Sequence, residues 1–228
     1  MTNEQIEAIA KIIAPKLSKH QDEILLNELL FQRVAAVYRN KDAEPLTSEQ
    51  EKLLEETYKD FVRGGAELPK DKKERLKEIN AELSLLSLKF GENVLKETNK
   101  FELVIEDEAD LSGLPDGVIA AASETAKERG KPGKWVFTLD KPSMIPLLQY
   151  STKRNLREKI FTAYINMGNN DDELDNKSTL AKMAALRAER AQVIGYETHA
   201  HNVLEKNMAK QPTNVYERLH QLWTPALK

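Results

Sequence analysis

The clearest structural signal in the sequence is the stretch PKDKKERLKEINAELSLLSLKFGENVLKETN, residues 69–99. Its apolar residues recur in alternating steps of three and four, at Leu76, Ile79, Leu83, Leu86 and Phe90. This spacing places them along one face of a helix, as in a heptad seam. At about 1.5 Å per residue the helix would be about 45 Å long. We therefore expect one long helix with an apolar seam.

Two interpretations of this seam stay open. It can pack inside the chain's own fold, as one arm of a long antiparallel helical hairpin, or it can form a dimerising coiled coil. From Leu76 to Phe90 it contains fewer than three full heptads, which favours packing within the fold.

Helical patterns also precede the seam, so residues 1–100 as a whole are expected to be helical. Thr2 and Gln5 form a capping-box pattern, and Pro15 is expected to end the helix that they begin. A second helical stretch is expected from about residue 17 to 39.

A third helix is expected just before the long one. Thr47 and Gln50 repeat the capping box at its start, and Gly64 and Gly65 are expected to end it.

The pattern changes over residues 101–140, which we expect to form a small β-containing insert. Two runs near 101–107 and 134–140 alternate apolar and polar residues, as strands do. A helix is expected between them, from about 116 to 129. The sequence does not decide whether the two strands are parallel or antiparallel.

Residues 141–228 return to helical patterns. Helices are expected after Pro146, after Thr152, over about 173–194, from the N-cap Thr198 through Met208, and from Pro212 onward with Val215, Leu219 and Leu222 facing inward. The predicted fold class is therefore mainly α: a multi-helix bundle with long antiparallel helices and a small β element.

Composition excludes several classes of protein. A net charge of −3 and a pI near 5.9 disfavour a nucleic-acid-binding protein, which usually carries a basic stripe. The chain has no cysteine, so disulfides, cysteine-ligated zinc and a cysteine nucleophile are excluded. No stretch approaches the roughly 20 apolar residues that span a bilayer. We expect a cytoplasmic protein.

The stretch GYETHAHNVLEK, residues 195–206, raises the question of a zinc site. His199 and His201 are two residues apart, so on a helix they point to nearly opposite sides and cannot share a metal. Glu197 and Glu205 are the nearby carboxylates. We therefore expect no metal-ligating residue and no catalytic residue in this chain.

A second candidate, the acidic run at Asp171, Asp172, Glu173 and Asp175, suggests a calcium loop. It lacks the central glycine and the final glutamate of such a loop, so we expect a polar turn that leads into a helix.

Five stretches, taken in order, resemble one family. They are HQDEILLNELLFQRVAAVY (20–38), DFVRGGAELPKDKKERLKEINAELSLLSLKFGENVLKET (60–98), DLSGLPDGVIAAASETA (110–126), KWVFTLDKPSMIPLLQYSTKRNLREKIFTAY (134–164) and DNKSTLAKMAALRAERAQVIGYETHAHNVLEKNMAKQPTNVYERL (175–219). Together they resemble peptidyl-dipeptidases, also called dipeptidyl carboxypeptidases, of the thimet-oligopeptidase-like zinc metallopeptidases.

The resemblance implies a parent enzyme that removes dipeptides from the carboxyl ends of short peptides. Such enzymes bind zinc through a His-Glu-x-x-His helix and a later glutamate, and the motif glutamate activates the zinc-bound water. This sequence has no His-Glu-x-x-His. It is therefore expected to be one non-catalytic helical portion, residues 1–228, of a larger metallopeptidase, inactive alone and partnered by the catalytic half of the same polypeptide.

The end of the sequence, HQLWTPALK, shows no terminal cap, which fits that expectation. The alternative is a complete helical scaffold or interaction module related to these peptidases.

The matched motif residues imply structural roles in turns and helix packing. They are Arg63, Gly64, Gly65, Phe90, Asn93, Gly113, Leu114, Pro115, Asp175, Asn176, Arg187, Gly195, Met208 and Ala209.

Overall fold

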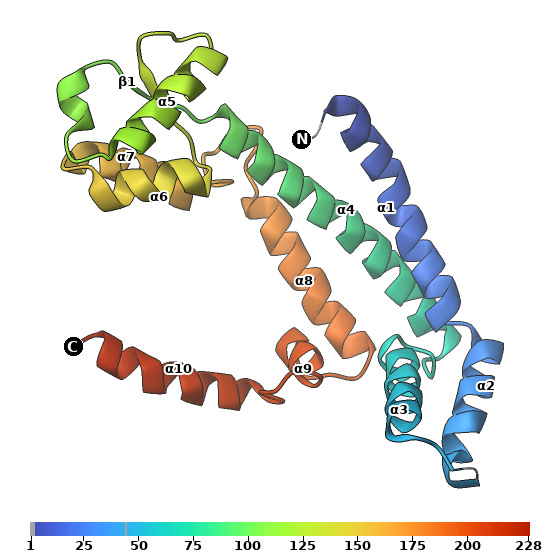
Figure 1. Cartoon of the computed structure of the whole chain (residues 1–228). Coiled ribbons are helices and arrows are strands. Elements are labelled where there is room, and N and C mark those ends of the chain that lie inside the picture. Colours follow the sequence, from blue (N-terminus) through green and yellow to red (C-terminus); the bar gives the residue numbers. More distant parts are fainter. Residues whose placement is uncertain (1–2, 44) are drawn as a thin grey trace. The chain divides into compact units, whose positions relative to one another are not determined.

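The computed structural model describes residues 3–43 and 45–228 (Figure 1). The predicted capping box of Thr2 and Gln5 falls partly outside these residues, because Thr2 is not described; the first described cap is Asn3, whose side chain accepts the Ile6 N–H. The chain divides into two compact units, residues 1–88 with 181–228 (unit 1) and residues 89–180 (unit 2).

The described residues are mainly helical, as predicted. The helices and strands are α1 (Glu4–Leu25), α2 (Glu28–Arg39), α3 (Ser48–Arg63), α4 (Lys70–Lys100), β1 (Leu103–Ile105), α5 (Asp116–Glu128), β2 (Trp135–Phe137), α6 (Lys141–Tyr150), α7 (Arg154–Ile165), α8 (Lys177–Val193), α9 (His199–Leu204) and α10 (Pro212–Ala226), with 3-10 turns at Lys41–Ala43 and Glu108–Leu111. Among the described helices, none combines the length and the apolar character that crossing a membrane requires.

The predicted break at Pro15 is wrong. Helix α1 continues through Pro15 as far as Leu25. Proline removes one backbone donor, and a 22-residue helix retains enough other hydrogen bonds to accommodate that loss. The break lies instead at Asn27, whose side chain accepts the Leu30 N–H at 2.9 Å and so begins α2.

Helices α2 and α3 pack together around a small apolar core in unit 1. Its buried members are Phe31, Ala35, Phe61 and Ala66. The capping box of Thr47 and Gln50 is confirmed at the start of α3.

The predicted end of α3 at the glycine pair is also confirmed, because the helix ends at Arg63. Gly65 has a φ of +98°, and a Cβ there would lie 2.7 Å from a methyl group of Leu76. Only glycine fits this turn into α4.

The long helix α4 spans Lys70–Lys100, as the seam predicts. Within unit 1, Leu76 and Ile79 are fully buried, whereas Leu83 and Leu86 are half-buried. Arg75 forms a bidentate ion pair with Glu189 of α8, with N···O distances of 2.7 and 2.9 Å.

Lys182 of α8 pairs with Glu82 of α4, so α8 runs antiparallel to α4. The predicted antiparallel arrangement of long helices is confirmed. The dimeric coiled-coil interpretation stays a prediction.

Unit 2 is built around a two-stranded antiparallel sheet, which settles the question of strand direction that the sequence left open. Leu103 of β1 lies opposite Phe137 of β2, and Ile105 lies opposite Trp135. Helices α5, α6 and α7 complete the core. Its buried members are Leu103, Ile105, Leu111, Leu114, Ala122, Phe137, Leu139, Met144, Leu147, Leu156 and Ile160, and the partly buried Trp135 packs against them.

Helix α6 begins at Lys141, before Pro146 rather than after it, so that prediction is wrong. The carbonyl of Asp140 accepts two backbone N–H groups of the first turn, from Ser143 at 2.9 Å and from Met144 at 2.8 Å. Pro142 fits in the first turn, because its fixed φ is already helical.

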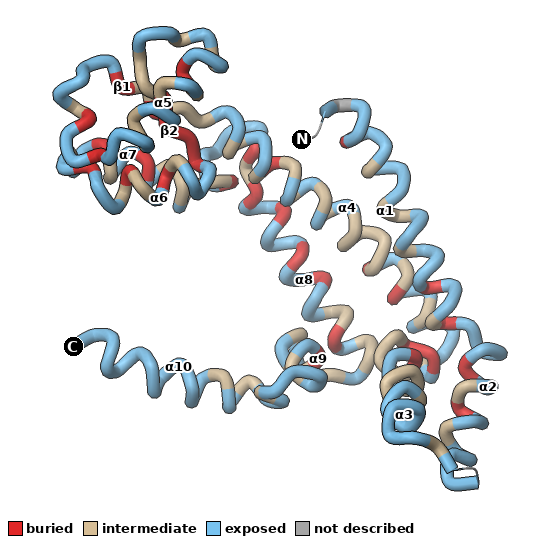
Figure 2. Tube along the Cα trace, viewed as in Figure 1, coloured by how far each residue is buried: buried red, intermediate tan, exposed pale blue. Residues whose placement is uncertain are grey.

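Three predictions about the C-terminal helices are wrong. Helix α8 begins at Lys177 rather than near residue 173, and α9 ends at Leu204 rather than continuing through Met208. Helix α10 begins at Pro212 as predicted, but its apolar side does not face inward. Leu219 and Leu222 are each 53% exposed, and Figure 2 shows α10 largely in the colour of exposed residues.

Candidate functional site

The two histidines of the 195–206 stretch lie in different surroundings. Thr198 caps α9 as predicted, by accepting the backbone N–H of His201 at 3.3 Å. The Nδ1 atom of His201 lies 2.8 Å from the Thr198 hydroxyl, and its Nε2 lies 3.7 Å from the Glu197 carboxylate. His199 lines a pocket together with Arg187 and Arg190.

Burial lowers the pKa of His199, and the charges of Arg187 and Arg190 lower it further. Two guanidinium groups beside an imidazole oppose the approach of a metal dication. Glu205 is already engaged by Arg63 and by the hydroxyl of Tyr196. The residues of this stretch therefore do not fit a zinc ion.

Within residues 3–43 and 45–228, no group of three or more histidine, cysteine, aspartate or glutamate side chains is placed to hold a metal.

The 195–206 stretch is attached to α3 by hydrogen bonds and ion pairs. Arg63 is the centre: its Nη2 donates to the carbonyl of Asn202 at 2.6 Å, and its Nη1 donates to the Tyr196 hydroxyl at 3.1 Å. The Arg63 side chain is only 17% exposed, and it also pairs with Glu205. These contacts join the end of α3 to α9 and the residues beside it.

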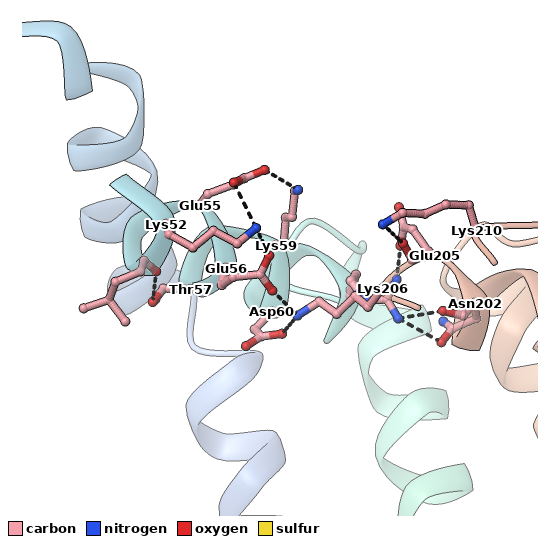
Figure 3. Close-up of polar contacts among 12 residues, drawn as sticks. Lys52, Glu55, Glu56, Thr57, Lys59, Asp60, Asn202, Glu205, Lys206 and Lys210 are labelled. Atoms are coloured by element: carbon pink, nitrogen blue, oxygen red, sulfur yellow. Dashed lines mark hydrogen bonds and ion pairs between the residues drawn. The ribbon is translucent and has the colours of Figure 1, made fainter. Parts of the chain in front are cut away.

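Lys206 adds an outer layer to this attachment. It lies between two acids of α3, 3.1 Å from the Glu56 carboxylate and in an ion pair with Asp60, as Figure 3 shows. The pKa of Glu56 is lowered to about 2. The hydrogen bond from Lys52 is the largest cause, and the hydrogen bond from Lys206 is the next. Exposed ion pairs of this kind contribute little stability individually, so Arg63 is the stronger link.

The acidic run at 171–175 is a turn that begins a helix, as predicted. One oxygen of Asp175 accepts the Asp171 N–H at 2.9 Å, and the other accepts the Lys177 N–H at 2.8 Å. The same carboxylate pairs with the Lys177 ammonium, whose hydrogen bond is the largest cause of the lowered Asp175 pKa.

Among the residues matched to the family, Asn93 and Asn176 form a buried pair in unit 2. The Nδ2 of Asn93 donates to Oδ1 of Asn176 at 3.0 Å, and the Nδ2 of Asn176 donates to the carbonyl of Phe90 at 3.1 Å. Both residues are buried, so these bonds fix the turn before α8 against α4.

Sequence reasoning missed one polar chain in unit 1. Asn80 donates from Nδ2 to Asp22 at 2.7 Å and accepts from Nε of Arg190 at 2.9 Å. These residues are far apart in sequence, so no spacing could have predicted the contact. One signal was present: Arg190 occupies a position on the otherwise apolar face of α8, with Leu186 and Val193.

Comparison with known proteins identifies the relatives of this chain. Residues 147–228 match Peptidase family M3. Over 98% of the chain, 30% of residues are identical to the probable cytosolic oligopeptidase A of Arabidopsis thaliana, of which the chain covers 33%. Identity is 33% to oligopeptidase A of Salmonella typhimurium over 91% of the chain, covering 31% of that protein. It is 31% to the dipeptidyl carboxypeptidase of Escherichia coli over 92% of the chain, again covering 31% of that protein.

The chain thus spans about a third of the length of the curated relatives it matches. The family match covers α7, α8, α9 and α10 completely, and it includes the 195–206 stretch. By these similarities the chain resembles the oligopeptidases and dipeptidyl carboxypeptidases related to Peptidase family M3.

Proposed function

We propose that this chain is a non-catalytic helical portion of a zinc-dependent M3 peptidase that removes dipeptides from the carboxyl ends of short peptides. One observation carries the proposal: the similarity extends over nearly the whole chain yet covers only about a third of each relative. A region of the relatives twice as long as this chain is then left to supply the metal and the catalytic groups.

The residues support a scaffold role for the chain itself. Its histidine stretch is committed to attachment through Arg63, and the sequence contains no His-Glu-x-x-His. In this proposal the chain supplies one wall of the space in which the peptide lies, and the catalytic half of the same polypeptide supplies zinc, the general base and the groups that stabilise the intermediate. The compartment we propose is the cytoplasm, which fractionation of the source cells would test.

The experiment compares the 228-residue chain with the product of the complete open reading frame of its gene. Zinc is measured by mass spectrometry, and hydrolysis is followed on one short peptide with a free carboxyl end and on its amidated form. We expect the longer protein to hold one zinc and to release dipeptides only from the free-carboxyl peptide, while the 228-residue chain does neither.

Three results would contradict this. One tightly bound zinc in the 228-residue chain would place the metal here. Equal cleavage of the amidated peptide would indicate an oligopeptidase that ignores the carboxyl end. An open reading frame that stops after Lys228 would favour the alternative of a complete helical scaffold.

A further inference from the structure

A pocket of about 370 Å³ in unit 1 is lined by residues of α1, α4, α8 and α9. Three of its lining residues can carry positive charge: Arg187, Arg190 and His199. Asp22 is the single acid among the described residues that line it. Cationic groups therefore outnumber acids in this pocket.

The one acid offsets at most one of these cationic groups. Burial raises the pKa of Asp22, although Asn80, Arg190 and Lys77 act in the opposite direction. Asp22 is only 6% exposed, and it accepts a hydrogen bond from Asn80 at 2.7 Å. Its carboxylate is thus turned to an internal partner.

The two arginines differ in how they are held. The Nε of Arg190 donates to Asn80 Oδ1 at 2.9 Å, which orients the guanidinium and leaves its terminal nitrogens without a hydrogen bond among the described residues. Burial is the main cause that lowers the pKa of Arg190. Arg187 makes no hydrogen bond or ion pair within the described part of the chain, and its side chain lies at the exposed rim.

Other pocket residues add neutral donors. Ser18 and Ser87 line the same space, and a serine hydroxyl can donate to a bound oxygen. An oriented guanidinium, a second free one, an imidazole and hydroxyls form the donor set that carboxylates and phosphates prefer.

We propose that this pocket binds a small oxyanion, a carboxylate or a phosphate, between Arg187 and Arg190 with His199 beside it. The proposal rests on residues of unit 1 alone, so it does not depend on the proposed function.

The test titrates the 228-residue chain with inorganic phosphate and, separately, with acetate, at ionic strength held constant with sodium chloride. Imidazole resonances are followed by NMR. We expect saturable shifts of the His199 resonance with at least one anion, while His220 on α10, outside the pocket, does not move. The anion that binds more tightly shows whether the pocket prefers a phosphate or a carboxylate.

The variant Arg187→Gln should weaken binding at least about tenfold, because it removes a charge-assisted donor pair. The matched control is Lys182→Gln on the same helix, whose lysine pairs with Glu82 outside the pocket. Arg190→Lys provides a second test that keeps the charge but loses the planar fork, and circular dichroism confirms that each variant is folded.

Equal binding by Arg187→Gln and Lys182→Gln would overturn the proposal. So would shifts of His199 and His220 of the same size, or shifts that fail to saturate with both anions.

Discussion

Unit 2 gathers most of its buried apolar side chains into one core, whereas unit 1 leaves more of its large apolar side chains exposed than unit 2 does. In unit 2, a two-stranded antiparallel sheet and three helices enclose a core of 11 buried residues. The α2–α3 core of unit 1 has four. On α1, Ile9 and Ile12 are each 58% exposed, and on α10 Trp223 is 63% exposed.

The difference shows how each unit is held. A sheet face covered by helices buries side chains from several elements at once. A helix with no element packed against it leaves its row of apolar side chains exposed. Unit 1 depends more on polar links between distant helices, such as those of Arg63 and Asn80. Four measurements test how the two units are stabilised.

The largest expected effect is in the core of unit 2. Ile160 is 0% exposed, so Ile160→Ala should lower the free energy of unfolding by about 2–5 kcal/mol, through lost burial and the cavity left behind. The matched variant on α10, Leu222→Ala, should change it by less than about 0.5 kcal/mol. Urea denaturation measures both. Similar losses for the two variants would show that the apolar stripe of α10 is buried in solution.

The next effect is the loss of a polar link in unit 1. Arg63→Ala removes hydrogen bonds to Asn202 and Tyr196 from a mostly buried side chain, and should cost about 1–3 kcal/mol. Amide exchange should increase over residues 196–205.

The control for this link is Lys59→Ala on the same helix, which removes only an exposed pair and should cost less than about 1 kcal/mol. If Arg63→Ala were as mild as the control, unit 1 would not depend on this link.

A smaller effect is expected at the cap of α9. Thr198→Ala removes the acceptor for the His201 N–H and should cost about 1 kcal/mol, while Thr198→Ser should restore most of the loss. Thermal denaturation compares them with Thr213→Ala, an exposed position on α10. A serine variant as unstable as the alanine variant would mean that the hydroxyl is not what stabilises the helix.

The smallest effect is a dependence on pH. Burial raises the pKa of Asp22 above its ordinary value of 3.8, so the folded chain holds this proton more tightly than the unfolded chain. The contribution of Asp22 to stability is therefore complete below pH 3.8 and is lost as the pH rises through the raised pKa. Asp22→Asn cannot titrate, so it should gain stability relative to the natural chain over that interval. Parallel stability curves for the two proteins, measured in urea across the acid range, would contradict this.

Local sequence pattern predicted most helices and both strands, and the errors had both local and tertiary causes. The seam of α4, the capping box at Thr47 and the alternating strands each carry their signal within a few residues. The exposure of Leu222 depends on which other elements lie beside α10, which no local pattern contains. The error at Pro15 was local, because a 22-residue helix retains enough other hydrogen bonds to continue through a proline.

At the candidate site, too, local spacing could be interpreted from the sequence and long-range contacts could not. The spacing of His199 and His201 was enough to disfavour a shared metal, because helix geometry is local. The chain of Asp22, Asn80 and Arg190 joins three helices that are distant in sequence, so only the folded chain reveals it. Arg190 on an apolar face was the one sign of it that could be read beforehand.

The positions of the two tryptophans have a spectroscopic consequence. Trp135 packs against the core of unit 2, whereas Trp223 is already 63% exposed on α10. Unfolding changes the solvent around Trp135 far more than that around Trp223. The chain's tryptophan fluorescence, excited selectively over that of tyrosine, thus reports mainly on residues 89–180, and Trp223→Phe would leave Trp135 as its single source.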